Sequence, residues 1–106
     1  MGQKGQLPQG EELEKEVRRL LNEGLVIWTK AEATIRDGGG SAKLTNDGFR
    51  GIEPGGWGLS VHRVRAKAGA GKLVYVAYAS RDGWALPILS QSLCEMLFNK
   101  AAEKAL

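Results

Sequence analysis

Residues 73–79 read LVYVAYA, with an apolar or aromatic side chain at every position. Side chains alternate between the two faces of a β-strand, so this stretch would be apolar on both faces. It therefore predicts a strand deep in a sheet or at an interface, with Tyr75 and Tyr78 on opposite faces. The turn-forming residues 81–83, Arg-Asp-Gly, end the strand.

Upstream, residues 25–36 alternate with a period of two and predict a strand with one buried face. Ile27 lies on the face predicted to be buried. Trp28, Lys30 and Arg36 lie on the face predicted to be wet.

Three shorter extended segments lie between these two strands. Residues 42–45 and 49–52 predict the arms of a hairpin, because 46–48, Asn-Asp-Gly, is typical of a turn. Residues 59–67 are also extended, but their apolar positions change parity near 62–63, which predicts a bulge there. Residues 53–56, Glu-Pro-Gly-Gly, interrupt the pairing.

Two helices flank the strands. Residues 10–23 place Leu13, Val17 and Leu20 on one stripe, and Gly24 is suited to end that helix. A second helix is expected from Pro87 to the C-terminus. The fold class is therefore α+β: an N-terminal helix, an antiparallel meander of four to five strands and a C-terminal helix, in a single two-layer domain.

The domain is expected to span residues 10–106, preceded by a flexible arm over residues 1–9. Of the 106 residues, 25% are charged, and the net charge of +3 is only mildly basic. The single cysteine excludes an intramolecular disulfide and favours a reducing compartment, so a cytoplasmic protein is expected. No apolar run is long enough to span a membrane, and no membrane partner is expected.

No arrangement of residues predicts catalysis. Residues 69–72, Gly-Ala-Gly-Lys, lack the first glycine, the hydroxyl residue and the helix of a phosphate-binding loop. His62 is the only histidine and has no set of metal-ligating or triad partners. Cys94 falls on or beside the apolar stripe of the last helix, which predicts a buried thiol. We therefore expect no enzyme activity, no catalytic residue, no metal and no cofactor.

Cationic and aromatic side chains on neighbouring strands suggest a nucleic-acid interface. Cations can bind phosphates, and flat side chains can stack on unpaired bases. The predicted site for RNA or a single strand comprises Trp28, Lys30, Arg36, His62, Arg63, Arg65 and Lys67. The element order is similar to that of double-stranded RNA-binding domains and of the small Alu-binding proteins of the signal recognition particle, although no motif of either family occurs here.

The alternative is a protein-interaction module: an inhibitor, an adaptor or a homodimer that pairs through a sheet edge or an exposed tryptophan. Trp57 is the candidate protein-binding residue, because a large ring among glycines either fills the end of the core or stands out as an anchor. Trp84 lies beside another turn and is expected to fill the core.

Overall fold

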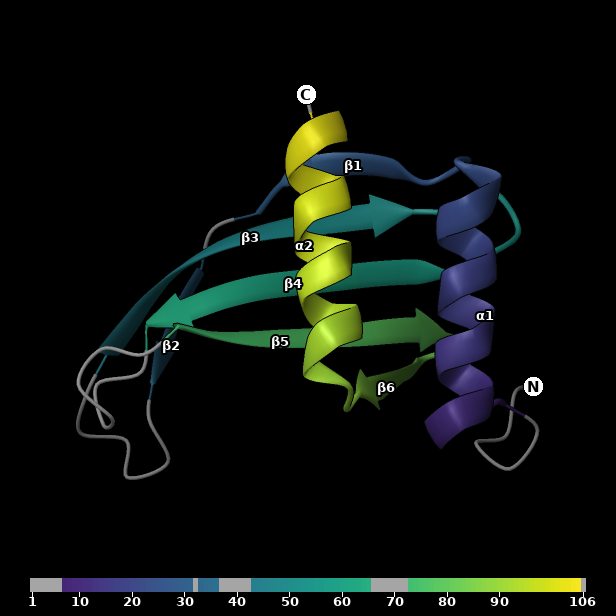
Figure 1. Cartoon of the computed structure of the whole chain (residues 1–106), viewed down its shortest axis with the longest axis horizontal. Helices are drawn as coiled ribbons and strands as arrows, with labels where there is room; N and C mark the ends of the chain where they lie inside the picture. Colours follow the sequence, from purple (N-terminus) through teal and green to yellow (C-terminus); the bar gives the residue numbers. More distant parts are fainter. Residues whose placement is uncertain (1–6, 32, 37–42, 66–72, 106) are drawn as a thin grey trace.

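The computed structural model describes residues 7–31, 33–36, 43–65 and 73–105, with the backbone alone at 33–36, 43–46 and 65. Its elements are, in order, α1 (Gly10–Glu23), β1 (Ile27–Lys30), β2 (Ala33–Arg36), β3 (Lys43–Ile52), β4 (Gly58–Arg65), β5 (Leu73–Arg81), β6 (Trp84–Ile88) and α2 (Gln91–Lys104). The strands form one antiparallel sheet in the order β1-β3-β4-β5-β6, and β2 pairs with the first half of β3. Both helices lie on one side of the sheet, with α2 across its middle and α1 across the strand ends (Figure 1). The predicted α+β fold is confirmed.

Helix α1 forms where the sequence predicts it. Its stripe of Leu13, Val17 and Leu20 is at most 1% exposed. Gly24 adopts a φ of 68° and donates its N–H to the Leu21 carbonyl, which ends the helix in the left-handed conformation that glycine tolerates best.

The faces of β1 are the reverse of the prediction. Trp28 is 2% exposed and lies on the helix side, whereas Ile27 is 62% exposed on the other side. The ring has room because Trp28 pairs with Gly51 of β3, where a Cβ would come within 2.9 Å of the ring. Burying the larger apolar ring decides the orientation of the strand. The predicted strand over residues 25–36 corresponds to two shorter strands, β1 and β2, which pair with β3 in the same register.

Strand β3 is continuous through the predicted turn at 46–48. All three residues pair with β4, so the predicted hairpin arms are wrong. Gly48 is needed inside the strand because the His62 side chain lies against it and a Cβ there would also come within 2.6 Å of the Ala31 carbonyl oxygen. The predicted bulge is wrong as well, since β4 pairs residue for residue with both neighbours through positions 62 and 63.

Strand β5 lies between β4 and β6, as expected of an interior strand. Asp82 and Gly83, with φ values of 52° and 83°, form the tight turn into β6. The turn was predicted from the sequence, but the strand after it was not. Pro87 belongs to this edge strand and does not begin a helix. Helix α2 begins instead at Gln91, where the Ser90 hydroxyl accepts the Leu93 N–H at 3.3 Å.

The core lies between α2 and the sheet. Leu93 and Leu97 are fully buried, and the Phe98 ring meets Phe49 and Tyr75 edge-on with centroids 5.2 and 5.6 Å apart. None of the helices described is both long and apolar enough to cross a membrane.

Candidate binding surfaces

The side chains predicted to share a wet surface do not gather in the described part of the chain. Trp28 is buried beneath α2, and Lys30 stands in a row with Phe49 and Val61 on the helix side, at the β1 edge. Arg63 is on the helix side too. Its guanidinium lies 4.6 Å from the centre of the Phe98 ring, and its Nη2 donates to the Asp47 carboxylate at 3.2 Å.

His62 points to the other side of the sheet, because it follows buried Val61 in β4. Burial, followed by the charge of Arg50, lowers the pKa of the imidazole, so His62 is neutral at neutral pH. The remaining predicted cations, the side chains of Arg36 and Arg65 and the whole of Lys67, lie outside the described residues, as does the loop at 69–72.

Trp57 is not an exposed anchor, since it is 5% exposed in the turn before β4. The Glu53 carboxylate accepts the Gly55 N–H at 2.7 Å and the Trp57 N–H at 3.2 Å, and the Arg81 guanidinium lies 5.2 Å from the ring centre. These contacts hold the Trp57 ring in place at the end of the core. Trp84, expected in the core, is instead 40% exposed.

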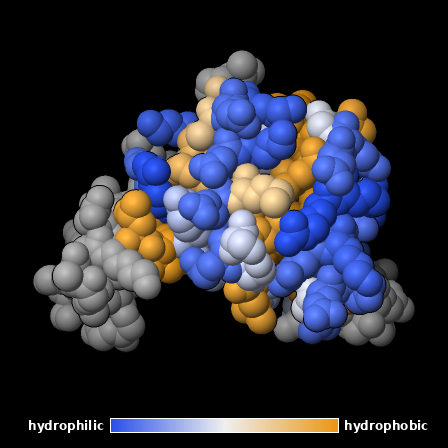
Figure 2. Space-filling view, in the orientation of Figure 1, coloured by the Kyte–Doolittle hydropathy of each residue, from blue (hydrophilic) through white to orange (hydrophobic). Residues whose placement is uncertain are grey.

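The outer surface of the helix side is polar. Figure 2 shows hydrophilic side chains over both helices and a seam of hydrophobic atoms between them. Much of the polarity of α1 comes from carboxylates and arginines that pair along the helix: Arg19 bonds Glu16 and Glu23. Pairing of this kind is typical of a solvated face.

The opposite side of the sheet, here named the open face, is not covered by either helix (Figure 1). Three neighbouring rows of its side chains cross the strands, and Val64 and Val74 form a fourth row beyond them. The first row is Ile27, Ile52, Gly58, Ser80 and Ala85; the second is Thr29, Arg50, Ser60, Tyr78 and Pro87; the third is Gly48, His62 and Val76. The strand alternation supports this assignment, because Ala77 and Ala79 are at most 2% exposed whereas Tyr78 between them is 39% exposed.

The open face carries exposed apolar side chains and little charge. Ile27 and Ile52 are 62% and 65% exposed and stand opposite each other on β1 and β3. Among the side chains in the three rows, Arg50 alone carries a fixed charge, and none is a carboxylate. The solvated face of an antiparallel sheet normally carries charged and polar side chains. The exposed isoleucines and the low charge of the open face therefore require an explanation.

The sheet also has a free edge at β1. The Ala31 N–H donates to the Gly48 carbonyl at 2.8 Å, which makes that pair a hydrogen-bonded one. Since such pairs alternate along an antiparallel ladder, the peptide groups of Trp28 point away from β3. The strand is only four residues long and ends in Lys30, a combination that discourages pairing with another strand.

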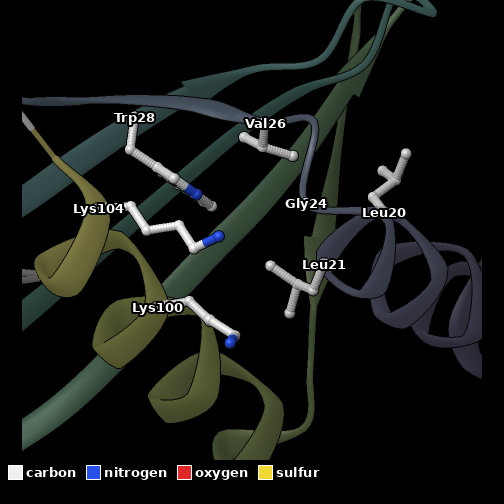
Figure 3. Close-up of a pocket in the computed structure, with 7 residues that line it drawn as sticks. All are labelled: Leu20, Leu21, Gly24, Val26, Trp28, Lys100 and Lys104. Atoms are coloured by element: carbon white, nitrogen blue, oxygen red, sulfur yellow. The ribbon is translucent and has the colours of Figure 1, made fainter.

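A narrow cleft lies where the C-terminal ends of α1 and α2 meet β1 (Figure 3). Leu20, Leu21 and Val26 line it, and the amino groups of Lys100 and Lys104 point into it. Helix α1 has no basic residue in its last turn, so these lysines place positive charge beside its C-terminal carbonyls. This arrangement stabilises the contact between the two helices.

Reactive groups do not converge in the described ranges. Cys94 is buried as predicted, donates to the Ile88 carbonyl at 3.3 Å and has a pKa raised by burial, so it is a poor nucleophile. The described residues contain no group of three or more His, Cys, Asp or Glu side chains able to hold a metal.

The open face was not predicted from the sequence, although one signal pointed to it. Residues 73–79 are apolar at every position, which allowed a strand at an interface, and Tyr78 belongs to that stretch. The exposed isoleucines of β1 and β3 were missed because Ile27 was assigned to the buried face. Comparison with protein-family models, with curated proteins and with solved structures finds no match to this chain.

Proposed function

We propose that the protein is a protein-interaction module that binds its partner through the open face of the sheet. The observation that carries this proposal is the exposure of Ile27, Ile52 and Tyr78 on a face that neither helix covers. Monomeric proteins rarely leave large contiguous apolar patches in water, and such patches commonly mark interaction sites.

The energetics favour a partner that removes these side chains from water. Full burial of an isoleucine or a large aromatic side chain contributes about 1.5–3 kcal/mol. Ile27 and Ile52 keep more than half of their surface exposed and Tyr78 keeps 39%, so each still has about 1 kcal/mol to gain on binding. Hydroxyl groups of Thr29 and Ser60 in the next row can supply hydrogen bonds between the apolar contacts.

Nucleic acid is the second candidate, because Tyr78 could stack on a base and Arg50 in the same row could bind a phosphate. A single fixed positive charge is too few for nucleic-acid binding. Nucleic-acid binding depends on releasing counterions through several phosphate contacts, and protein binding does not. The composition of the open face therefore favours a protein.

Site-specific photo-crosslinking tests the proposal. A photoreactive amino acid replaces Ile52 on the open face, and in a matched control it replaces Glu95, which is exposed on α2. In cells producing the full chain, we expect a discrete protein adduct from position 52 and none from position 95. An adduct that disappears on nuclease treatment would indicate nucleic acid instead, and the absence of any adduct at position 52 would refute the proposal.

A further inference from the structure

We infer that the partner on the open face is a second copy of this chain, related by a two-fold axis that runs along β4. This inference rests on the proposed function and names its partner. It follows from how the side chains of the three rows meet when the face is packed against itself.

Two sheets that pack face to face as a symmetric dimer need a two-fold axis in the plane between them. An axis across the strands through the second row would place β3 on the partner's β3 and the two Arg50 side chains against each other. An axis along β4 reverses the strand order, so β3 lies on the partner's β5 and β1 lies on the partner's β6. Repulsion between like charges disfavours the transverse axis through this row, and the axis along β4 avoids that repulsion.

With this axis, each residue of the second row faces the residue at the opposite end of the same row in the partner. Arg50 faces the partner's Tyr78, a pairing in which a guanidinium can lie over an aromatic ring, and the contact occurs twice. Thr29 faces the partner's Pro87, and Ser60 meets the partner's Ser60 on the axis, where two hydroxyl groups can hydrogen-bond. The single charge of the open face thus finds a complementary group.

The first row can also pack against its copy about this axis. Ile27 faces the partner's Ala85 and Ile52 faces the partner's Ser80, so large side chains of one chain meet small ones of the other. Gly58 lies on the axis in this row, where the absence of a side chain allows close approach. An axis tilted about 15° from β4 would give the crossing angle of about 30° that packed sheets prefer.

The size of the open face predicts a weak dimer. Strands about 4.8 Å apart and rows about 6.8 Å apart give a footprint of roughly 24 by 20 Å, or about 480 Å² on each chain. Specific interfaces bury roughly 800 Å² of accessible surface on each partner, and protruding side chains add to a projected area. The projected footprint lies below the roughly 600–1,000 Å² per partner of standard interfaces, so the dimer is expected to be weak.

A charge exchange across the axis tests this geometry. Analytical ultracentrifugation over micromolar to millimolar concentrations measures dimerisation of the wild type, Arg50→Glu, Tyr78→Arg and the double variant. Each single substitution should raise the dissociation constant at least tenfold, because it removes or opposes a contact that occurs twice. The double variant should recover much of that loss, since the carboxylate introduced at position 50 would then face the guanidinium introduced at position 78 of the other chain.

Both substituted side chains are exposed, and far-UV circular dichroism verifies that every variant is folded. A monomer throughout the concentration range, or a double variant no better than the single ones, would overturn the inference. Crosslinking from position 52 separates the two proposals: an adduct of twice the chain mass supports a second copy, an adduct with another protein overturns only the second copy, and no protein adduct overturns both.

Discussion

Replacing Trp28 with alanine tests the reversal of the β1 faces most directly. The ring is 2% exposed and packs over Gly51. Removing about 200 Å² of buried aromatic surface at about 25 cal/mol per Å² corresponds to about 5 kcal/mol, and comparable core substitutions cost about 3–5 kcal/mol. Because a domain of this size is stable by only about 5–15 kcal/mol, Trp28→Ala should remove a large share of the free energy of unfolding.

Urea denaturation followed by far-UV circular dichroism gives the free energy of unfolding. Trp84→Ala is the matched control, because it removes the same side chain from a position that is 40% exposed, and by the same accounting it should cost about 3 kcal/mol. A loss of less than about 1 kcal/mol for Trp28→Ala, or equal losses for the two variants, would mean that the Trp28 ring is not in the core.

Three further predictions concern packing and charge. Gly48→Ala should destabilise the fold by about 1–3 kcal/mol, because its Cβ would collide with His62 and Ala31. Gly58→Ala, whose Cβ would have no neighbour nearer than 3.7 Å, should cost far less. Urea denaturation compares the free energies of unfolding of the two variants. The lowered pKa of His62 means that the folded state takes up a proton less readily than the unfolded state. The free energy of unfolding should therefore fall as the pH drops below about 6.5. A His62→Gln variant with the same pH dependence between about pH 6.5 and 5 would contradict this prediction. Lys104→Glu should lower stability by a few tenths of a kcal/mol through repulsion with the C-terminal end of α1. That effect should shrink at high salt, and an unchanged effect would exclude an electrostatic cause.

The elements that the sequence predicts well are those in which local and tertiary preferences agree. Helix α1 has one apolar stripe and a glycine at its end, and it forms over the predicted range. Helix α2 was predicted too early, because Pro87 is compatible with both a helix start and an edge strand. Leu86 and Ile88 alternate after the Asp-Gly turn, and this signal could have revealed β6.

The glycines in β3 explain a second kind of error. An Asn-Asp-Gly sequence is typical of a turn when only local chemistry is considered. Here Gly48 is required by the close approach of His62 from β4, and Gly51 by the Trp28 ring from β1. Such long-range contacts leave no local pattern, so the continuity of β3 could not be predicted from the sequence around it.

The candidate site was mispredicted because a period of two separates the faces of a strand without saying which face is covered. In β1 both sets contain large apolar residues, and only the three-dimensional packing shows that Trp28 meets α2 while Ile27 remains in water. The same ambiguity carries functional information. A strand such as β5 that is apolar on both sides but covered by a helix on one side alone is expected where a second layer arrives from another molecule. The mixed character of β1 and β5 is therefore one property with two consequences: it hides the orientation of β1 in the sequence, and it supports a protein partner on the open face.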